Sequence, residues 1–397
     1  MRYFIILFFL GLVSNAISQT EINSAIKKDT VVQKESLKSD SDNYRQLEEV
    51  EIESKERSKK VTSSNRVQTS SINQSPGIQE QTIQLESANF SSYKAQSQTQ
   101  TQQRSPTEFK QQQMNGAVSY FETNAPESFE YHYYKYISGN YNTVLFPHLQ
   151  KAEQLKPNNS DVHVQMTSYY MVMNADNEAL KYLDKLVTSK RLAPSVVLYA
   201  EDVLRSVPEN GVLITHGFDD TYGVWYAQIK KGIRKDVTII SLDLMQSSKY
   251  LDLLKSKGFV IPNSSVIDVA FLNQFCHANA SENLSISLTT PKDYFKSMLS
   301  QVYLSGLVFE YRTSTFDNFW RNEILWDKEL KKELVENTVD EKGRSLSSNY
   351  LPMLFQMRKV YNQTGKDQKV KEMDAAIDKI GAQTNKYQQV QKMKDAY

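Results

Sequence analysis

A histidine and two aspartates stand together in the segment His216–Asp220, which reads HGFDD. Two carboxylates beside an imidazole can carry out acid–base chemistry or hold a divalent cation. An aspartate at the start of a helix can instead accept hydrogen bonds from backbone N–H groups that have no other partner there. We favour the second interpretation, in which Asp219 or Asp220 caps a helix and His216 is a solvated turn residue. We keep the first as the alternative.

The segment lies between a predicted strand and a predicted helix. Residues 211–215 form an apolar run bounded by turn residues, which indicates a buried strand. Gly232 ends the helix that follows, and residues 236–242 form a second apolar strand. Such a strand–helix–strand unit has parallel strands and a right-handed crossover. Its turn follows the carboxyl end of a strand, where open α/β sheets usually bind their ligands.

Two aromatic residues of the predicted helix allow two interpretations. Trp225 and Tyr226 could form a stacking platform for a sugar. The aromatic face of a helix is more often buried in the core, and these two residues share their face with Tyr222 and Ile229 at helical spacing. We therefore expect a core role and retain the sugar platform as the alternative.

A set of residues spread over the strand–helix–strand unit carries a resemblance: Thr215, Gly217, Asp220, Thr221, Tyr222, Trp225, Tyr226, Gln228, Arg234, Asp236 and Val237. Together they resemble the signature of the soluble C-terminal region of bacterial protein-O-mannosyltransferase-like membrane proteins. The chain departs from the family's usual turn at His216, Phe218 and Asp219, and Gly223 replaces the usual proline. The resemblance implies an α/β framework. The membrane-embedded catalytic half of that family is missing here, so we do not expect its transferase activity.

Composition limits the classes of function. The 397 residues carry a formal net charge of +1, which gives no general attraction to nucleic acid or acidic lipid. The single cysteine, Cys276, excludes an intrachain disulfide and a site of several thiolates. There is no glycine-rich phosphate loop, and zinc-ligand spacing is absent among His132, His148, His163 and His277. We therefore predict no cofactor, no metal site and no nucleic-acid partner.

The N-terminal residues predict export. Residues 1–18 combine Arg2 with a short apolar run and a small-residue end, which is typical of a signal peptide cleaved before Gln19. An uncleaved N-terminal anchor is the alternative. We expect no membrane-spanning segment after cleavage, and a periplasmic or secreted location. Residues 19–116 are rich in Ser, Gln, Thr, Lys and Glu, and they predict a disordered, low-complexity tether.

The rest of the chain predicts a mixed α/β fold, in which tetratricopeptide-like helical hairpins pack with a small parallel-sheet α/β domain. Residues 117–206 contain two helical pairs that resemble tetratricopeptide units, with matches at Gly139, Tyr141 and Pro157. The α/β domain is expected over residues 207–343, with 284–288 and 302–309 as further strands. A C-terminal helical pair follows over residues 344–382, and residues 383–397 predict a flexible tail.

These expectations lead to one main hypothesis and one alternative. The main hypothesis is an exported, non-enzymatic envelope protein that acts as a protein–protein interaction scaffold, with an unidentified envelope protein as its partner. The alternative is a glycan-handling or glycosylation-associated protein, binding or enzymatic, that uses the segment His216–Asp220. A cleft with convergent polar groups around Asp219 and Asp220 would favour the alternative. An exposed, aromatic-rich groove on the helices would favour the scaffold.

Overall fold

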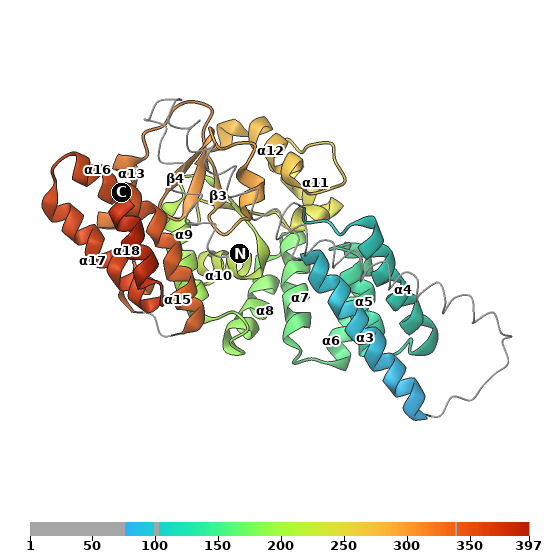
Figure 1. Ribbon diagram of the computed structural model, residues 1–397. Helices are drawn as coiled ribbons and strands as arrows, with labels where there is room; N and C mark the ends of the chain where they lie inside the picture. The colour runs from blue at the N-terminus through green and yellow to red at the C-terminus, as the bar shows by residue number, and fades with distance from the viewer. Residues whose placement is uncertain (1–75, 99–102, 338–339, 397) are drawn as a thin grey trace, which may run out of the picture. The chain divides into compact units, whose positions relative to one another are not determined.

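A computed structural model describes residues 76–98, 103–337 and 340–396 of the chain. The predicted signal peptide and residues 19–75 of the predicted tether lie outside the described residues. The helical part comprises α3 (Pro76–Gln98), α4 (Glu108–Asn124), α5 (Phe129–Ser138), α6 (Phe146–Leu155), α7 (Ser160–Val172), α8 (Asp176–Thr188) and α9 (Pro194–Ser206). The α/β part comprises β1 (Val212–Thr215), α10 (Gly217–Lys231), β2 (Thr238–Ser241), α11 (Ser248–Ser256), α12 (Val269–Ala278), β3 (Leu284–Ser287), β4 (Val302–Ser305) and β5 (Val308–Tyr311). The C-terminal helices are α13 (Phe319–Ile324), α14 (Glu333–Glu336), α15 (Glu341–Ser347), α16 (Leu351–Gln363), α17 (Asp367–Gln383) and α18 (Tyr387–Ala396) (Figure 1).

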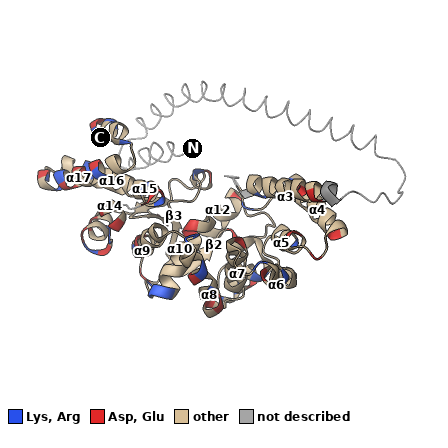
Figure 2. Cartoon of the chain, turned by 90° about the horizontal axis from the view of Figure 1, so that it is seen from below, with Lys and Arg blue, Asp and Glu red and all other residues tan. Residues whose placement is uncertain are grey.

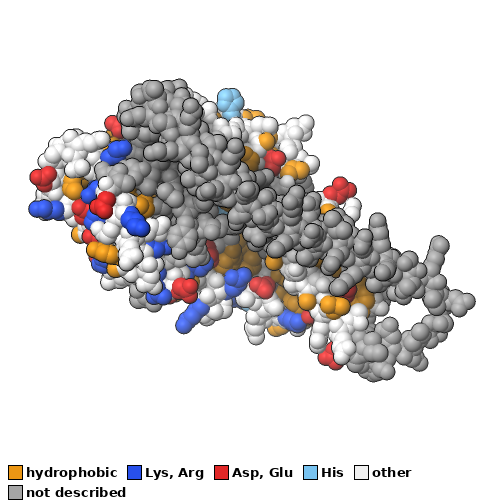
Figure 3. Space-filling model, in the orientation of Figure 1, with side chains coloured by type: hydrophobic (Ala, Val, Ile, Leu, Met, Phe, Trp, Pro, Cys, Tyr) orange, Lys and Arg blue, Asp and Glu red, His pale blue; other side chains and the backbone are white. Residues whose placement is uncertain are grey.

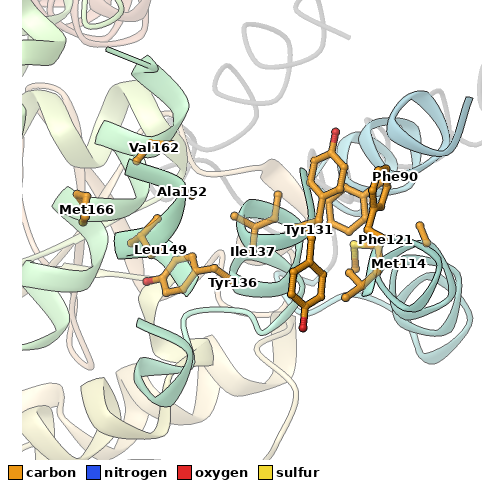
Figure 4. Close-up of a cluster of buried hydrophobic side chains, with 13 residues drawn as sticks. Phe90, Met114, Phe121, Tyr131, Tyr136, Ile137, Leu149, Ala152, Val162 and Met166 are labelled. Atoms are coloured by element: carbon orange, nitrogen blue, oxygen red, sulfur yellow. The ribbon is translucent and has the colours of Figure 1, made fainter. Parts of the chain in front are cut away.

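Helices α3 to α7 share one hydrophobic core (Figure 4). Polar caps define where these helices begin, because Ser128 and Asn159 accept backbone N–H groups in the first turns of α5 and α7. The buried side chains of the core come from all five helices: Phe90, Met114, Phe121, Tyr131, Tyr136, Ile137, Leu149, Ala152, Val162 and Met166. The ring of Phe90 stacks on Tyr134 with 4.1 Å between centroids, so α3 is an integral part of this core.

The sheet has five strands in the order β2-β1-β3-β5-β4. Strand β1 pairs in parallel with β2 on one side and with β3 on the other. Helix α10 connects β1 to β2 and packs closely on α9, because Gly223 has no side chain. A Cβ at that position would come within 3.0 Å of Val196 Cγ1. The mixed α/β fold class is therefore confirmed, and so is the strand–helix–strand unit.

The small sheet was predicted to be parallel, and it is so only between β1 and its neighbours β2 and β3. Strand β5 runs antiparallel to both β3 and β4, so the sheet is mixed. Residues 302–309 were predicted as one strand, but Gly306 divides them into a hairpin with two residues between the strands. Gly306 has φ +59°, which suits the first central position of a tight hairpin turn and which other residues rarely adopt.

Two segments predicted to lack structure are helical. Helix α3 and the start of α4 fall within the predicted tether, and Phe90 and Met114 bury themselves in the core. The predicted flexible tail contains α18, whose Val390 and Met393 are buried. In each case a few apolar residues at helical spacing, separated by polar residues, are enough to dock the helix on a neighbour.

Among the C-terminal helices, α14 and α15 pack on α9, and α16 packs on α13 and on β4. Gly365 lies between α16 and α17 with φ +66°, which fits the predicted helical pair. Lys/Arg and Asp/Glu are interspersed along these helices (Figure 2), as in the ion pairs Arg358–Asp374 and Lys394–Asp374. No helix among the described residues combines the length and apolar character that crossing a membrane requires.

Candidate functional site

A cleft of about 470 Å³ lies at the carboxyl ends of β1 and β2. The segment His216–Phe218 leaves β1 into the cleft, and Asp243 enters it two residues after β2. Because β2 and β3 flank β1 on opposite sides, the strand order reverses here, which is where open α/β sheets bind ligands. Helices α3, α5 and α7 supply the other walls, including Phe90, Lys94, Tyr133, Tyr134, Asp161 and Ser168.

An ion pair between Arg104 and Asp243 fixes one side of the cleft. Arg104 donates to Asp243 Oδ1 from Nη2 at 2.5 Å and from Nε at 2.6 Å, and the two side chains are 7% and 13% exposed. Asp243 Oδ2 also accepts the backbone N–H of Gly217 at 2.6 Å. Burial acts to raise the pKa of Asp243, but the charge of Arg104 holds that pKa below its ordinary value. Asp243 therefore stays ionised and ties residue 104 to the turn.

His216 lies in the wall of the cleft and not in bulk solvent, contrary to the prediction of a solvated turn residue. Its Nε2 is buried and has no hydrogen-bond partner among the described residues. Burial lowers the pKa of His216 to about 4, and the nearby Asp243 opposes that shift only in part. The imidazole is therefore neutral at physiological pH and offers one unused ring nitrogen.

The two predicted aspartates have different partners, and neither is the N-cap. The N-cap of α10 is His216, so Asp219 and Asp220 lie inside the first turn. Asp220 is 7% exposed and accepts the backbone N–H of His216 at 2.9 Å and the hydroxyl of Ser287 at 2.7 Å. Burial raises its pKa to about 6. Asp219 forms an exposed ion pair with Lys342 at 2.5 Å, and neither aspartate lines the cleft.

The two aromatic candidates also separate. Trp225 is only 2% exposed, and it lines the cleft beside Tyr222, with 5.3 Å between ring centroids. Tyr226 does not line the cleft; it lies near Asp184 of α8, and burial with this carboxylate raises its pKa. The aromatic side chain at the turn itself is Phe218, which stands out in the sequence only as a departure from the family signature. The guanidinium carbon of Arg191 lies 4.7 Å from the centre of the Phe218 ring.

Several signature residues hold the framework and do not face the cleft. The guanidinium of Arg234 donates to the carbonyls of Leu204, Val207 and Pro208 at 2.7–3.1 Å. It also pairs with Asp236 at 2.7 Å, and this hydrogen bond lowers the pKa of Asp236 to about 2. These contacts fasten the end of α9 to the start of β2, which explains why such residues belong to the signature.

Sequence reasoning missed Lys94, Arg104, Arg191 and Asp243. Arg104 and Asp243 are 139 residues apart, so no local pattern joins them. Asp243 alone had a signal, because it is the first acidic residue after the second parallel strand.

Two of the histidines that are distant in sequence meet in the structure. The Nδ1 atoms of His132 on α5 and His148 on α6 lie 3.0 Å apart. Burial lowers the pKa of both rings. Throughout the described ranges, no group of three or more His, Cys, Asp or Glu side chains is placed to hold a metal ion.

The fold and the cleft define a class: a mixed α/β domain with a cleft at the carboxyl ends of its parallel strands and helices on either side. The family model of TMEM260-associated domain 2 matches residues 196–394, and the chain belongs to this family. TMEM260 is a protein-O-mannosyltransferase-like protein, which agrees in broad terms with the resemblance found in the sequence. None of the curated proteins and none of the solved structures compared with the chain matches it.

The matched range begins in α9 and ends in α18, so it contains the sheet, the turn and the C-terminal helices. The cleft walls from α3, α5 and α7 lie outside that range. The family match therefore covers the α/β side of the cleft and not the walls from these helices.

Proposed function

We propose that this chain is an exported, non-enzymatic binding protein that holds a glycan in the cleft at His216–Phe218. The observation that carries the proposal is the lining of the cleft, which combines aromatic rings with hydrogen-bonding groups. Tyr133, Tyr141 and Phe218 are half-buried and offer ring surface, while the half-buried Gln165 and Gln246 offer side-chain amides. Sugars present both apolar C–H faces and hydroxyl groups, and a site for them needs both kinds of contact.

Binding is favoured over catalysis by the placement of the titratable groups. A general acid and a general base must both reach the reacting atoms. Asp219 is exposed and paired with Lys342, and Asp220 lies outside the cleft lining. Asp243 is held by Arg104 and by a backbone N–H. Of the four candidates His216, Asp219, Asp220 and Asp243, only His216 both lines the cleft and has a side-chain polar atom without a hydrogen-bond partner among the described residues.

The scaffold hypothesis remains a second proposal, supported by the helical hairpins. Helices α5 and α6 pack together, as do α7 and α8. We propose that these pairs are tetratricopeptide-like and that the turn Gly139–Tyr141 corresponds to the turn within such a unit. An envelope protein would then be the partner of the helices, and a periplasmic or secreted location follows from the predicted signal peptide. The resemblance to the bacterial subgroup of the family belongs to the same proposal.

The test of glycan binding compares two aromatic residues of α10. Phe218 lines the cleft and Tyr226 does not, and both are half-buried. In titration calorimetry of the purified chain with a panel of mono- and disaccharides, Phe218→Ala should weaken binding about tenfold, because one stacking contact is worth about 1–1.5 kcal/mol. Tyr226→Ala should leave binding unchanged. Equal losses from both variants, or no sugar binding by the wild type, would contradict the proposal.

A further inference from the structure

The charges that face the cleft are not balanced. Three cationic side chains line it: Lys94 from α3, Arg104 from the segment before α4, and Arg191 from the loop between α8 and α9. Two anionic side chains line it, Asp161 and Asp243. Elsewhere, positive and negative side chains are interspersed on the visible face (Figure 3). The lining of the cleft, by contrast, carries one more positive than negative side chain.

Asp243 is not available to balance the remaining cations. One of its oxygens accepts two hydrogen bonds from Arg104, and the other accepts the N–H of Gly217. A carboxylate with both oxygens engaged at 2.5–2.6 Å has little capacity for a further close partner. The Arg104–Asp243 pair is therefore neutral as a unit.

Lys94 is a half-buried ammonium without a close anionic partner in the described part of the chain. Its Nζ donates to the carbonyl of Ile137 at 3.3 Å and to Asn140 Oδ1 at 3.4 Å, which are long hydrogen bonds to neutral groups. Burial lowers its pKa to about 8, against the opposing effect of Asp243. A cation removed from water is stabilised by a paired anion, and Lys94 is one of the residues that line the cleft.

Arg191 is also only partly engaged. The distance from Nη2 to Asp161 Oδ1 is 3.6 Å, which is too long for a hydrogen bond, and both side chains are well exposed. The guanidinium carbon lies 4.7 Å from the centre of the Phe218 ring, and both residues line the cleft. A planar guanidinium in this state can donate two parallel hydrogen bonds to a carboxylate or a phosphate.

We infer that the glycan bound in the cleft carries an anionic group, a carboxylate or a phosphate, which Lys94 and Arg191 recognise. The inference rests on the proposed function and gives it a ligand class. The aromatic and amide-bearing walls contact the sugar ring, and the two cations select the charged substituent. The shared chemistry is that of a sugar acid or a sugar phosphate.

The experiment is calorimetry of the purified full chain with four probes: mannose, glucuronic acid, mannose 6-phosphate and inorganic phosphate. At least one charged sugar should bind about tenfold or more tightly than mannose, since hydrogen bonds to charged groups are the stronger ones. Lys94→Gln and Arg191→Gln should remove that preference. Lys94→Arg keeps the positive charge and should retain much of the preference for the charged sugar. A loss in Lys94→Gln that Lys94→Arg does not share is then due to the missing charge. Lys249→Gln, which removes an exposed lysine on α11, should have no effect.

The outcomes separate the two proposals. Equal affinity for mannose and for both charged sugars would overturn the anionic class and leave glycan binding intact. Binding of inorganic phosphate, abolished by Lys94→Gln and without binding of any sugar, would support the anion site and overturn the glycan. No binding of any probe would overturn both. The ranking of glucuronic acid against mannose 6-phosphate identifies the charged substituent.

Discussion

Replacing Asp243 with Asn tests whether the Arg104–Asp243 pair fastens the N-terminal helical segment to the α/β domain. The substitution keeps the size of the side chain and one acceptor oxygen for the N–H of Gly217. It removes the negative charge opposite Arg104, whose side chain is only 7% exposed. The guanidinium is then left largely buried without a counter-ion.

The expected loss is large for one substitution. Breaking a buried ion pair by removing one partner costs about 3–5 kcal/mol. Asp243 is 13% exposed, so some water reaches the pair, and we expect a loss of about 3 kcal/mol in the free energy of unfolding. The matched control is Asp219→Asn in the same turn. Asp219 pairs with Lys342, and their side chains are 36% and 45% exposed, so the control should cost at most about 1 kcal/mol.

Urea unfolding at pH 7 measures both variants, and a double-mutant cycle with Arg104→Gln isolates the coupling between the two side chains. The cycle should give a favourable coupling of about 2 kcal/mol or more, and Arg104→Gln should partly rescue Asp243→Asn. A cost below 1 kcal/mol for Asp243→Asn, equal to that of Asp219→Asn, would refute the reasoning. Additive effects in the cycle would refute it as well.

Two further predictions concern pH and backbone conformation. The pKa of Asp220 is raised from 3.8 to about 6, so the native state binds this proton more tightly than the unfolded state. Its contribution to stability is therefore present below about pH 4 and is lost as pH rises to about 6, by up to about 3 kcal/mol. Asp220→Asn should remove this pH dependence. Urea unfolding of both proteins at pH 4, 5, 6 and 7 gives their free energies of unfolding. A difference between the two proteins that stays constant with pH would contradict the prediction. Gly306→Ala should destabilise the chain more than Gly365→Ala. Both glycines have positive φ, so alanine is strained at either position. Only at Gly306 would the new Cβ also collide with Ser206, because open space surrounds Gly365. Thermal melts of the two variants give the ranking, and an equal loss would contradict it.

The strand–helix–strand unit could be predicted because its signals are local. The apolar runs at 212–215 and 238–241, the helical spacing of the aromatic residues and the terminating Gly232 each depend on near neighbours in sequence. The cap was placed incorrectly because His216 is an unusual N-cap without a side-chain hydrogen bond. The helix therefore begins earlier than the two aspartates suggest.

The cleft could not be predicted because its parts come from distant segments. Lys94, Arg104 and Arg191 belong to separate parts of the chain and meet only after the helical segment packs on the α/β domain. Phe90 and Met114 stand in polar surroundings, so composition predicted a tether where the structure has α3 and α4. These two buried side chains are enough to dock the helices on the core, and the average composition of a polar segment does not reveal them.

The most direct test of glycan binding in the cleft is hydrogen–deuterium exchange of the full chain with and without a saturating charged sugar. Binding should slow amide exchange in the first turn of α10, around Gly217–Tyr222, and in α3 near Lys94, because the ligand contacts both walls. Exchange in α16–α18, which do not line the cleft, should not change. Protection confined to α16–α18, or no protection at Gly217–Tyr222 at saturation, would contradict the proposed site.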